Sequence, residues 1–135
     1  MLQIMNKLGD QLVRYVEQAR SCGVAMIVYS DSAGTLDILG PRIMEQTTRD
    51  FTHGFLKKLA NAIDDTMIIQ LCPKIAYALV DVGVAEMKVH DFGERVDFFE
   101  ACLNLRGTAR LVGQTCVKYT GATIANGKIR EIVLK

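Results

Sequence analysis

Residues 66–92, TMIIQLCPKIAYALVDVGVAEMKVHDF, form the stretch that decides the predicted fold. The first six residues are an apolar run that is typical of a buried strand. Pro73 suits the first turn of a short helix that Gly83 would end, and residues 84–92 favour another strand. Strand, short helix and strand in this order allow a βαβ unit, although about ten helical residues are near the minimum for a crossover between parallel strands.

The chain before this stretch predicts a helix and a hairpin. Residues 2–21 place apolar side chains on one helical face at steps of three and four, namely Met5, Leu8, Leu12, Val16 and Ala19. The β-branched run 24–30 favours a strand. The turn residues 31–34 and the apolar segment 35–39 follow it, which together indicate a hairpin.

A long helix is predicted over residues 41–63, with Pro41 in its first turn. Apolar side chains recur along it at the helical period, at Met44, Thr48, Phe51, Phe55, Leu59 and Ala62. Gly54 lies inside this helix and should weaken it by about 1 kcal/mol relative to alanine.

The chain after residue 92 predicts one ambiguous segment and a C-terminal β-meander. Residues 94–105 fit both the period of a helix and the alternation of a strand, and we favour the helix. Apolar and polar residues alternate over 109–119, as in a half-buried strand. Asn126-Gly127 then predicts a hairpin that joins strands at 121–125 and 128–134.

These elements indicate one α+β domain over residues 1–135, with a mostly antiparallel sheet, the long helix packed on one face and the C-terminal β-meander. The order of helix, strand, strand, helix and strand in the first 70 residues is similar to profilin-like sensory folds, including roadblock-type and GAF-type modules. The resemblance is one of layout over half of the chain, and it implies a ligand-binding or regulatory role. The order of the strands in the sheet stays open.

The composition excludes several classes of protein. Half of the 135 residues are apolar, 23% are charged and the net charge is +1, which suits one globular core and argues against disorder. No apolar run approaches the roughly 20 residues of a membrane span, and charged residues interrupt the first helix. We therefore expect no membrane segment, no signal peptide and a soluble, cytoplasmic protein.

The four cysteines, Cys22, Cys72, Cys102 and Cys116, are too widely spaced for a local metal clip. We interpret them as small buried residues of a reducing compartment, without disulfides. Cys72 is the exception to watch, because it precedes Pro73 at a strand-to-helix junction where a thiol can become reactive. It is therefore a candidate ligand-binding residue, and neither a metal nor a cofactor is predicted.

The string IVYSDSAGTLDIL (27–39) contains the sharpest local motif. Asp31-Ser-Ala-Gly-Thr after an apolar strand resembles the nucleophile motif of haloacid-dehalogenase-like phosphatases. That resemblance implies a nucleophilic Asp31, but Ala33 stands where the family has a second aspartate that serves as acid and base. We favour an ordinary turn in which Asp31 bonds to its own backbone, and keep Asp31 as a candidate catalytic residue.

Both histidines are candidate functional residues. His53 is predicted on the polar face of the long helix, where a histidine is solvated or at an interface more often than catalytic or ligand-binding. His90 and Asp91 end the predicted strand 84–92 and are the other candidates for acid/base catalysis. Three carboxylates follow at helical steps, Glu94, Asp97 and Glu100, and we interpret them as a solvated acidic face rather than a cation site.

Charge is divided unevenly along the chain. Residues 1–100 carry 10 basic and 14 acidic side chains, whereas residues 101–135 carry 6 basic and 1 acidic. Arg106, Arg110 and Lys118 are therefore candidates for a nucleic-acid surface. Nucleic-acid binding is still not expected, because stacking aromatics are nearly missing and the net charge is small. The basic tail of one subunit also suits the acidic front of another.

No single activity follows from these residues. The preferred hypothesis is a small ligand-binding or regulatory module, not an enzyme, that acts as a homo-oligomer. One alternative is a phosphatase- or thioesterase-like hydrolase that uses Asp31, His53 or the pair His90 and Asp91, and another is a nucleic-acid-binding module. A largest pocket that contained neither histidine nor Asp31 would weaken the hydrolase hypothesis badly.

Overall fold

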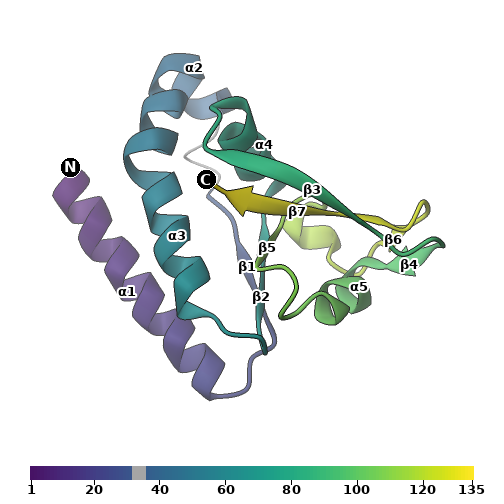
Figure 1. Ribbon diagram of the computed structural model, residues 1–135. Coiled ribbons are helices and arrows are strands. Elements are labelled where there is room, and N and C mark those ends of the chain that lie inside the picture. Colours follow the sequence, from purple (N-terminus) through teal and green to yellow (C-terminus); the bar gives the residue numbers. More distant parts are fainter. Residues whose placement is uncertain (32–35) are drawn as a thin grey trace.

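The centre of the fold is a mixed five-stranded sheet (Figure 1). The computed structural model describes residues 1–31 and 36–135, and across the sheet the strands are β1 (Met26–Tyr29), β2 (Ile68–Leu71), β5 (Leu111–Val112), β7 (Lys128–Leu134) and β3 (Ala85–Asp91). β1 is parallel to β2 and β2 to β5, whereas β7 is antiparallel to both of its neighbours. The protein is α+β, but its sheet is mixed where the sequence favours a mostly antiparallel one.

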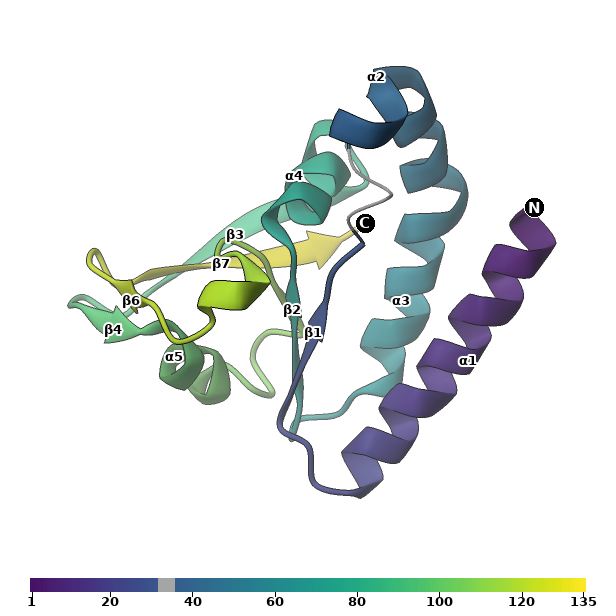
Figure 2. The same ribbon diagram turned by 180° about the vertical axis from the view of Figure 1, so that it is seen from behind.

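Helices cover both faces of this sheet. On one face lie α1 (Leu2–Ser21), α3 (His53–Ala62) and α4 (Pro73–Asp81), and α2 (Leu36–Thr47) leads into α3 through the π-helical segment η1 (Thr48–Thr52). On the other face lie α5 (Phe98–Asn104), η2 (Val117–Tyr119) and a small sheet of β4 (Val96–Asp97) and β6 (Thr123–Ile124). Figure 2 shows α5, β4 and β6 on the opposite side of the sheet from α3.

β2 connects the two layers, because all four of its side chains are buried. Ile69 and Leu71 belong to the core under α3 and α4, and Ile68 belongs to the core under α5. Successive side chains of a strand point to opposite faces, so a strand that is covered on both faces needs the continuous apolar run of residues 66–71. The predicted strands at 66–71 and 84–92 and the helix between them are confirmed, but two other strands separate β2 from β3.

α1 confirms the predicted N-terminal helix, but its buried face differs from the predicted one. Val16 is buried, whereas Leu8 and Leu12 are exposed. The helix approaches α3 through Gly9, where a Cβ atom would lie 3.0 Å from the ring of Phe55. The close contact at glycine turns part of the apolar surface of α1 away from the core.

The predicted helix over residues 41–63 is divided among α2, η1 and α3. Gly40 has a φ of 74° and kinks α2 just before Pro41. The predicted apolar stripe is nevertheless buried or half-buried along this run, at Met44, Thr48, Phe51, Phe55, Leu59 and Ala62.

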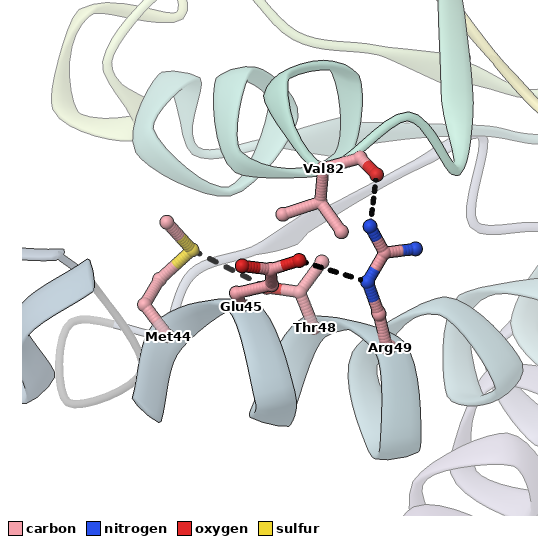
Figure 3. A network of polar contacts seen from close by, with 5 residues as sticks. All are labelled: Met44, Glu45, Thr48, Arg49 and Val82. Atoms are coloured by element: carbon pink, nitrogen blue, oxygen red, sulfur yellow. Dashed lines mark hydrogen bonds and ion pairs between the residues drawn. The ribbon is translucent and has the colours of Figure 1, made fainter. Parts of the chain in front are cut away.

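Figure 3 shows how the middle of this helical run is tied to α4. Arg49 donates from Nη2 to the carbonyl oxygen of Val82 at 2.8 Å, and its Nε donates to the Glu45 carboxylate at 3.1 Å. Thr48 lies next to Arg49, and its hydroxyl contacts the sulfur of Met44 at 3.5 Å. The last carbonyls of a helix have no partner within the helix, so Arg49 satisfies one of them at the end of α4.

The predicted hairpin after β1 is wrong. Residues 36–39 begin α2, and residues 32–35, which include most of the predicted turn, lie outside the described part of the chain. Leu36 and Ile38 are exposed, and Asp37 forms an ion pair with Lys74 of α4. Over the described residues 2–31 and 36–71 the order is helix, strand, three helical segments and strand, which does not confirm the profilin-like layout.

The predicted C-terminal meander is also wrong. β5 covers only two residues of the predicted strand 109–119, and β6 pairs with β4 instead of β7. At Gly113 the chain passes so close to α4 that a Cβ atom would lie 2.6 Å from that of Ala76, and the strand has ended there. The turn at Asn126-Gly127 is present, with a φ of 66° at the glycine, but it joins strands of two different sheets.

Residues 94–105 contain β4 and α5, which confirms the helix that we favoured there. Asp97 begins α5, because its carboxylate accepts a hydrogen bond from the backbone N–H of Glu100 at 3.0 Å. Within the described residues, the helices are all too short or too polar to cross a membrane.

Candidate functional site

A crevice of about 480 Å³ opens between α3 and the C-terminal half of β7. β5 pairs with β7 at one position, Val112 with Glu131, so residues 132–134 extend beyond the end of the shorter strand. α3 and the loop after α5 border the resulting gap. The polar lining residues are Lys57, Asn61, Thr108, Arg110 and Glu131, and the apolar ones include Ala60, Leu111, Ile132, Val133 and Leu134. This volume lies in the range of small-molecule sites.

Arg110 is fixed in the wall of the crevice by the end of α3. Its Nη1 donates to the carbonyl oxygen of Ala60 and, at 2.9 Å, to that of Ile63. Arg20 of α1 donates to the neighbouring carbonyl of Ala62, also at 2.9 Å. Helix C-termini carry partial negative charge and unpaired carbonyls, so two cations stabilise this end of α3.

Glu131 of β7 also borders the crevice, and His90 holds its carboxylate. His90 on β3 is directly across from Ile129 on β7, so Glu131 is its diagonal neighbour on the same face of the sheet. The imidazole Nε2 donates to the carboxylate oxygen Oε2 at 2.5 Å, and the two side chains are only 15% and 12% exposed. Ile129 and Val112, which pair with His90 and Glu131, belong to the core under α5, so the ion pair lies on the face of the sheet away from α3.

His53, Lys57 and Asn61 lie one turn apart on the same face of α3. Lys57 and Asn61 line the crevice, whereas His53 donates from Nε2 to the backbone carbonyl of Lys135 at 2.8 Å. His53 is thus half-buried and holds the chain beyond β7 against α3. In the part of the chain that the structure describes, the lining of the crevice includes neither histidine and does not include Asp31.

Asp31 and Cys72 are brought to the same edge of the sheet, at the carboxyl ends of β1 and β2. These two parallel strands are in register at Tyr29 and Leu71. The crevice is at the other end of the strands, where Leu111 begins β5. Burial, together with the negative charge of Asp31, raises the pKa of Tyr29 to about 12. The two residues near this edge therefore do not join the histidines in one site.

The remaining candidates are dispersed over the surface. Asp91 accepts a hydrogen bond from the backbone N–H of Gly93 at 2.8 Å, as in a turn. Arg106 donates from Nε to the carbonyl of Leu103 at 2.9 Å, and Lys118 lies over the ring of Tyr119. Arg110 is held at α3, so the three basic candidates are engaged within the chain.

The cysteines are not uniformly buried as predicted. Cys102 is buried under α5, where burial first and the charge of Asp97 second raise the pKa of its thiol to about 12. Cys22 is exposed, and Cys72 and Cys116 are intermediate. Within residues 1–31 and 36–135, no three histidine, cysteine or acidic side chains are placed to hold a metal ion.

No motif in the sequence indicates Lys57 or Asn61 as lining residues, or Glu131 as the partner of His90. The one signal for Glu131 is its isolation, because it is the single acidic residue among residues 101–135. Lys57 and Asn61 share the polar helical face of His53, and their role depends on a gap between strands that no local pattern records.

Comparisons with known proteins add no family to this description. No protein-family model matches the chain, and searches of the curated proteins and of the solved structures found no significant match.

Proposed function

We propose that the protein is a ligand-binding or regulatory module that holds a small polar molecule in the crevice between α3 and β7 and acts as a homo-oligomer. The observation that carries this proposal is the mixed lining of one concavity, with the ammonium group of Lys57 and the amide of Asn61 on α3 beside the apolar residues of β5 and β7. A small carboxylate, such as a free amino acid, offers an anionic group to Lys57 and an apolar part to the rest of the lining.

The test is thermal unfolding with a panel of free amino acids. The chain contains no tryptophan, so unfolding is followed by calorimetry or circular dichroism. A ligand that binds only the folded state adds about 2.7 kcal/mol when its concentration is about 100 times Kd, which corresponds to a rise in Tm of about 10 °C for a domain of this size. A panel without any shift would contradict the proposed ligand class.

Two variants connect the shift to the crevice. Lys57→Met removes the ammonium group from the crevice, and Asn61→Leu removes the amide one turn further along α3; both should abolish the shift. Lys58→Met is the matched control for the first, because Lys58 is the next residue and pairs with Asp10 of α1 instead. Equal shifts in all three variants would place the ligand elsewhere.

The hydrolase alternative has less support. Its candidates Asp31, His53 and His90 lie at three separate places, and none of them lines the crevice. The nucleic-acid alternative relies on Arg106, Arg110 and Lys118, whose charged groups already have partners in the chain. Binding of a small molecule without turnover remains the function that the geometry supports best.

A further inference from the structure

α1 carries an exposed apolar stripe on a flank that α3 does not cover. Ile4, Leu8, Leu12 and Tyr15 recur at steps of four, four and three residues, and they are 46–66% exposed. At 100° per residue they form one stripe beside the buried face of Gly9 and Val16. Asp10, which pairs with Lys58, lies on the other flank of that buried face. The stripe is therefore a second apolar face of α1.

β1 is an edge strand with an unprotected outer side. Among the described residues it pairs with β2 alone, and Ala25 and Tyr29 accept their hydrogen bonds from β2 and the residue after it. Backbone groups alternate in direction along a strand, so those of Met26 and Val28 point outward. Residues 24–30 contain neither a charged side chain nor proline, which are the usual protections of an edge.

These two features lie at the same end of the molecule. Figure 2 shows α1 on the side of the sheet where β1 is the edge. The stripe, Leu2 and the exposed side chains of Val24 and Val28 together present on the order of 700 Å², close to the roughly 800 Å² that each partner contributes to a standard interface. Burial of these side chains in one contact would therefore approach the area of a standard dimer interface.

The edge of β1 is also complementary to itself. A two-fold axis at Ile27 would place Met26 opposite the partner's Val28, and each such pair exchanges two backbone hydrogen bonds. No like charges meet along residues 24–30, and the same rotation reverses the direction of α1 in the second copy, so that the two apolar stripes can face each other. Both unpartnered surfaces are then covered by one symmetric contact.

We infer that the protein forms a two-fold symmetric dimer in which β1 pairs with the partner's β1 and the apolar stripes of the two α1 helices pack together. The inference rests on the self-association in the proposed function and assigns a surface to it. It does not involve the crevice, because α1 and β1 contribute no residue to that lining.

Sedimentation equilibrium with two variants tests this surface. The wild type should have twice the chain mass of 14.9 kDa at high concentration and dissociate on dilution. Leu8→Glu places a charge in the stripe, and Val28→Pro removes an outward N–H while leaving the bonds to β2; each should raise the dimer Kd at least tenfold. Ile38→Glu, which changes an equally exposed apolar residue on α2, should leave Kd unchanged.

The outcomes separate this inference from the proposed function. A dimer that persists in both variants would contradict the proposed β1 and α1 interface, but it would still support self-association. A wild-type monomer at all concentrations overturns both the surface and self-association, whereas ligand binding is measured separately in the Leu8→Glu variant. Circular dichroism checks that each variant is folded, and Val28→Lys replaces Val28→Pro if the proline variant is not.

Discussion

At the scale of one residue, the hydrogen bonds of Gln70 explain why the chain leaves the sheet after β5. The side chain is fully buried on the α5 side of β2. Its Nε2 donates to the carbonyl of Thr115, and its Oε1 accepts from the hydroxyl of Thr120, both at 2.9 Å. An unpaired buried amide costs about 1–3 kcal/mol, so the loop that contains these partners is held over the sheet instead of continuing as a strand.

The half-buried Tyr29 should make the free energy of unfolding depend on pH in the alkaline range. The ring lies against Phe55, with 5.4 Å between centroids, and burial raises its pKa from 10.0 to about 12. An unfolded chain loses this proton near pH 10, whereas the folded chain keeps it. The contribution of Tyr29 is therefore fully present below pH 10 and is lost as the pH rises toward 12. The buried thiol of Cys102, whose pKa is raised from 9.0 to about 12, should likewise lower stability as the pH rises above 9.0.

Urea unfolding at a series of alkaline pH values measures this effect. The free energy of unfolding of the wild type should fall through the interval, and Tyr29→Phe should make that fall shallower, because phenylalanine does not ionise in either state. Tyr77→Phe removes an exposed tyrosine and should follow the wild type. A Tyr29→Phe variant that loses stability as steeply as the wild type would contradict the assignment.

At the scale of elements, arginines close the ends of two helices. Arg20 and Arg110 bind the last carbonyls of α3, and Arg49 binds that of Val82 after α4. A hydrogen bond to a charged group contributes about 1.5–3 kcal/mol when it is partly buried. These contacts join α1, the residue before β5 and η1 to the helices that cover the main core.

Arg110→Met should therefore lower the free energy of unfolding by about 1.5–3 kcal/mol. Methionine keeps the length of the side chain and removes both donors to the end of α3, while Arg110→Lys keeps the charge and should lose less. Arg42→Met, at an exposed position of α2, is the control and should change stability by less than about 0.5 kcal/mol. Urea unfolding measures these changes. Equal losses of unfolding free energy at Arg110 and Arg42 would contradict the capping role of Arg110.

Periodicity in the sequence predicted most elements but few of their partners. α4, α5, β2 and β3 appear where the local pattern places them, because each buries a face that the pattern records, whereas α1 appears in place but buries another face. The strand predicted at 109–119 fails because Gly113 passes against Ala76, which is a contact between distant segments. The hairpin at Asn126-Gly127 fails because the strands on its two sides pair with β4 and β3 instead.

The candidate site was predictable only in part for the same reason. His90 and Arg110 were candidates by residue type, but the partner of His90 is Glu131, which follows from the register of β3 and β7. The crevice exists because β5 begins only at Leu111 and leaves the C-terminal end of β7 unpaired on that side, and the length of a two-residue strand is set by tertiary contacts. Residue type therefore indicated participants, and strand pairing decided which of them meet.

At the scale of the whole molecule, the central strands are shared by two cores. The core under α3 and α4 contains Leu59 and Leu111, and the core under α5 contains Phe98 and Val112. Neighbouring residues of β5 thus belong to different cores. A strand cannot leave one core without leaving the other, so the two layers should unfold as one cooperative unit.

Two probes of urea unfolding test this cooperativity. Circular dichroism follows mainly the helices of the α3 layer, and labelling of the buried Cys102 follows the α5 layer, in a background where Cys22, Cys72 and Cys116 are serine. The two midpoints should coincide. Phe98→Ala should lower both midpoints together, because it lowers the free energy of unfolding by about 3–5 kcal/mol. Ile38→Ala, at an exposed position, should move neither. Labelling of Cys102 at a urea concentration where the helices are intact would mean that the α5 layer opens alone, and the shared strands would then not couple the two cores.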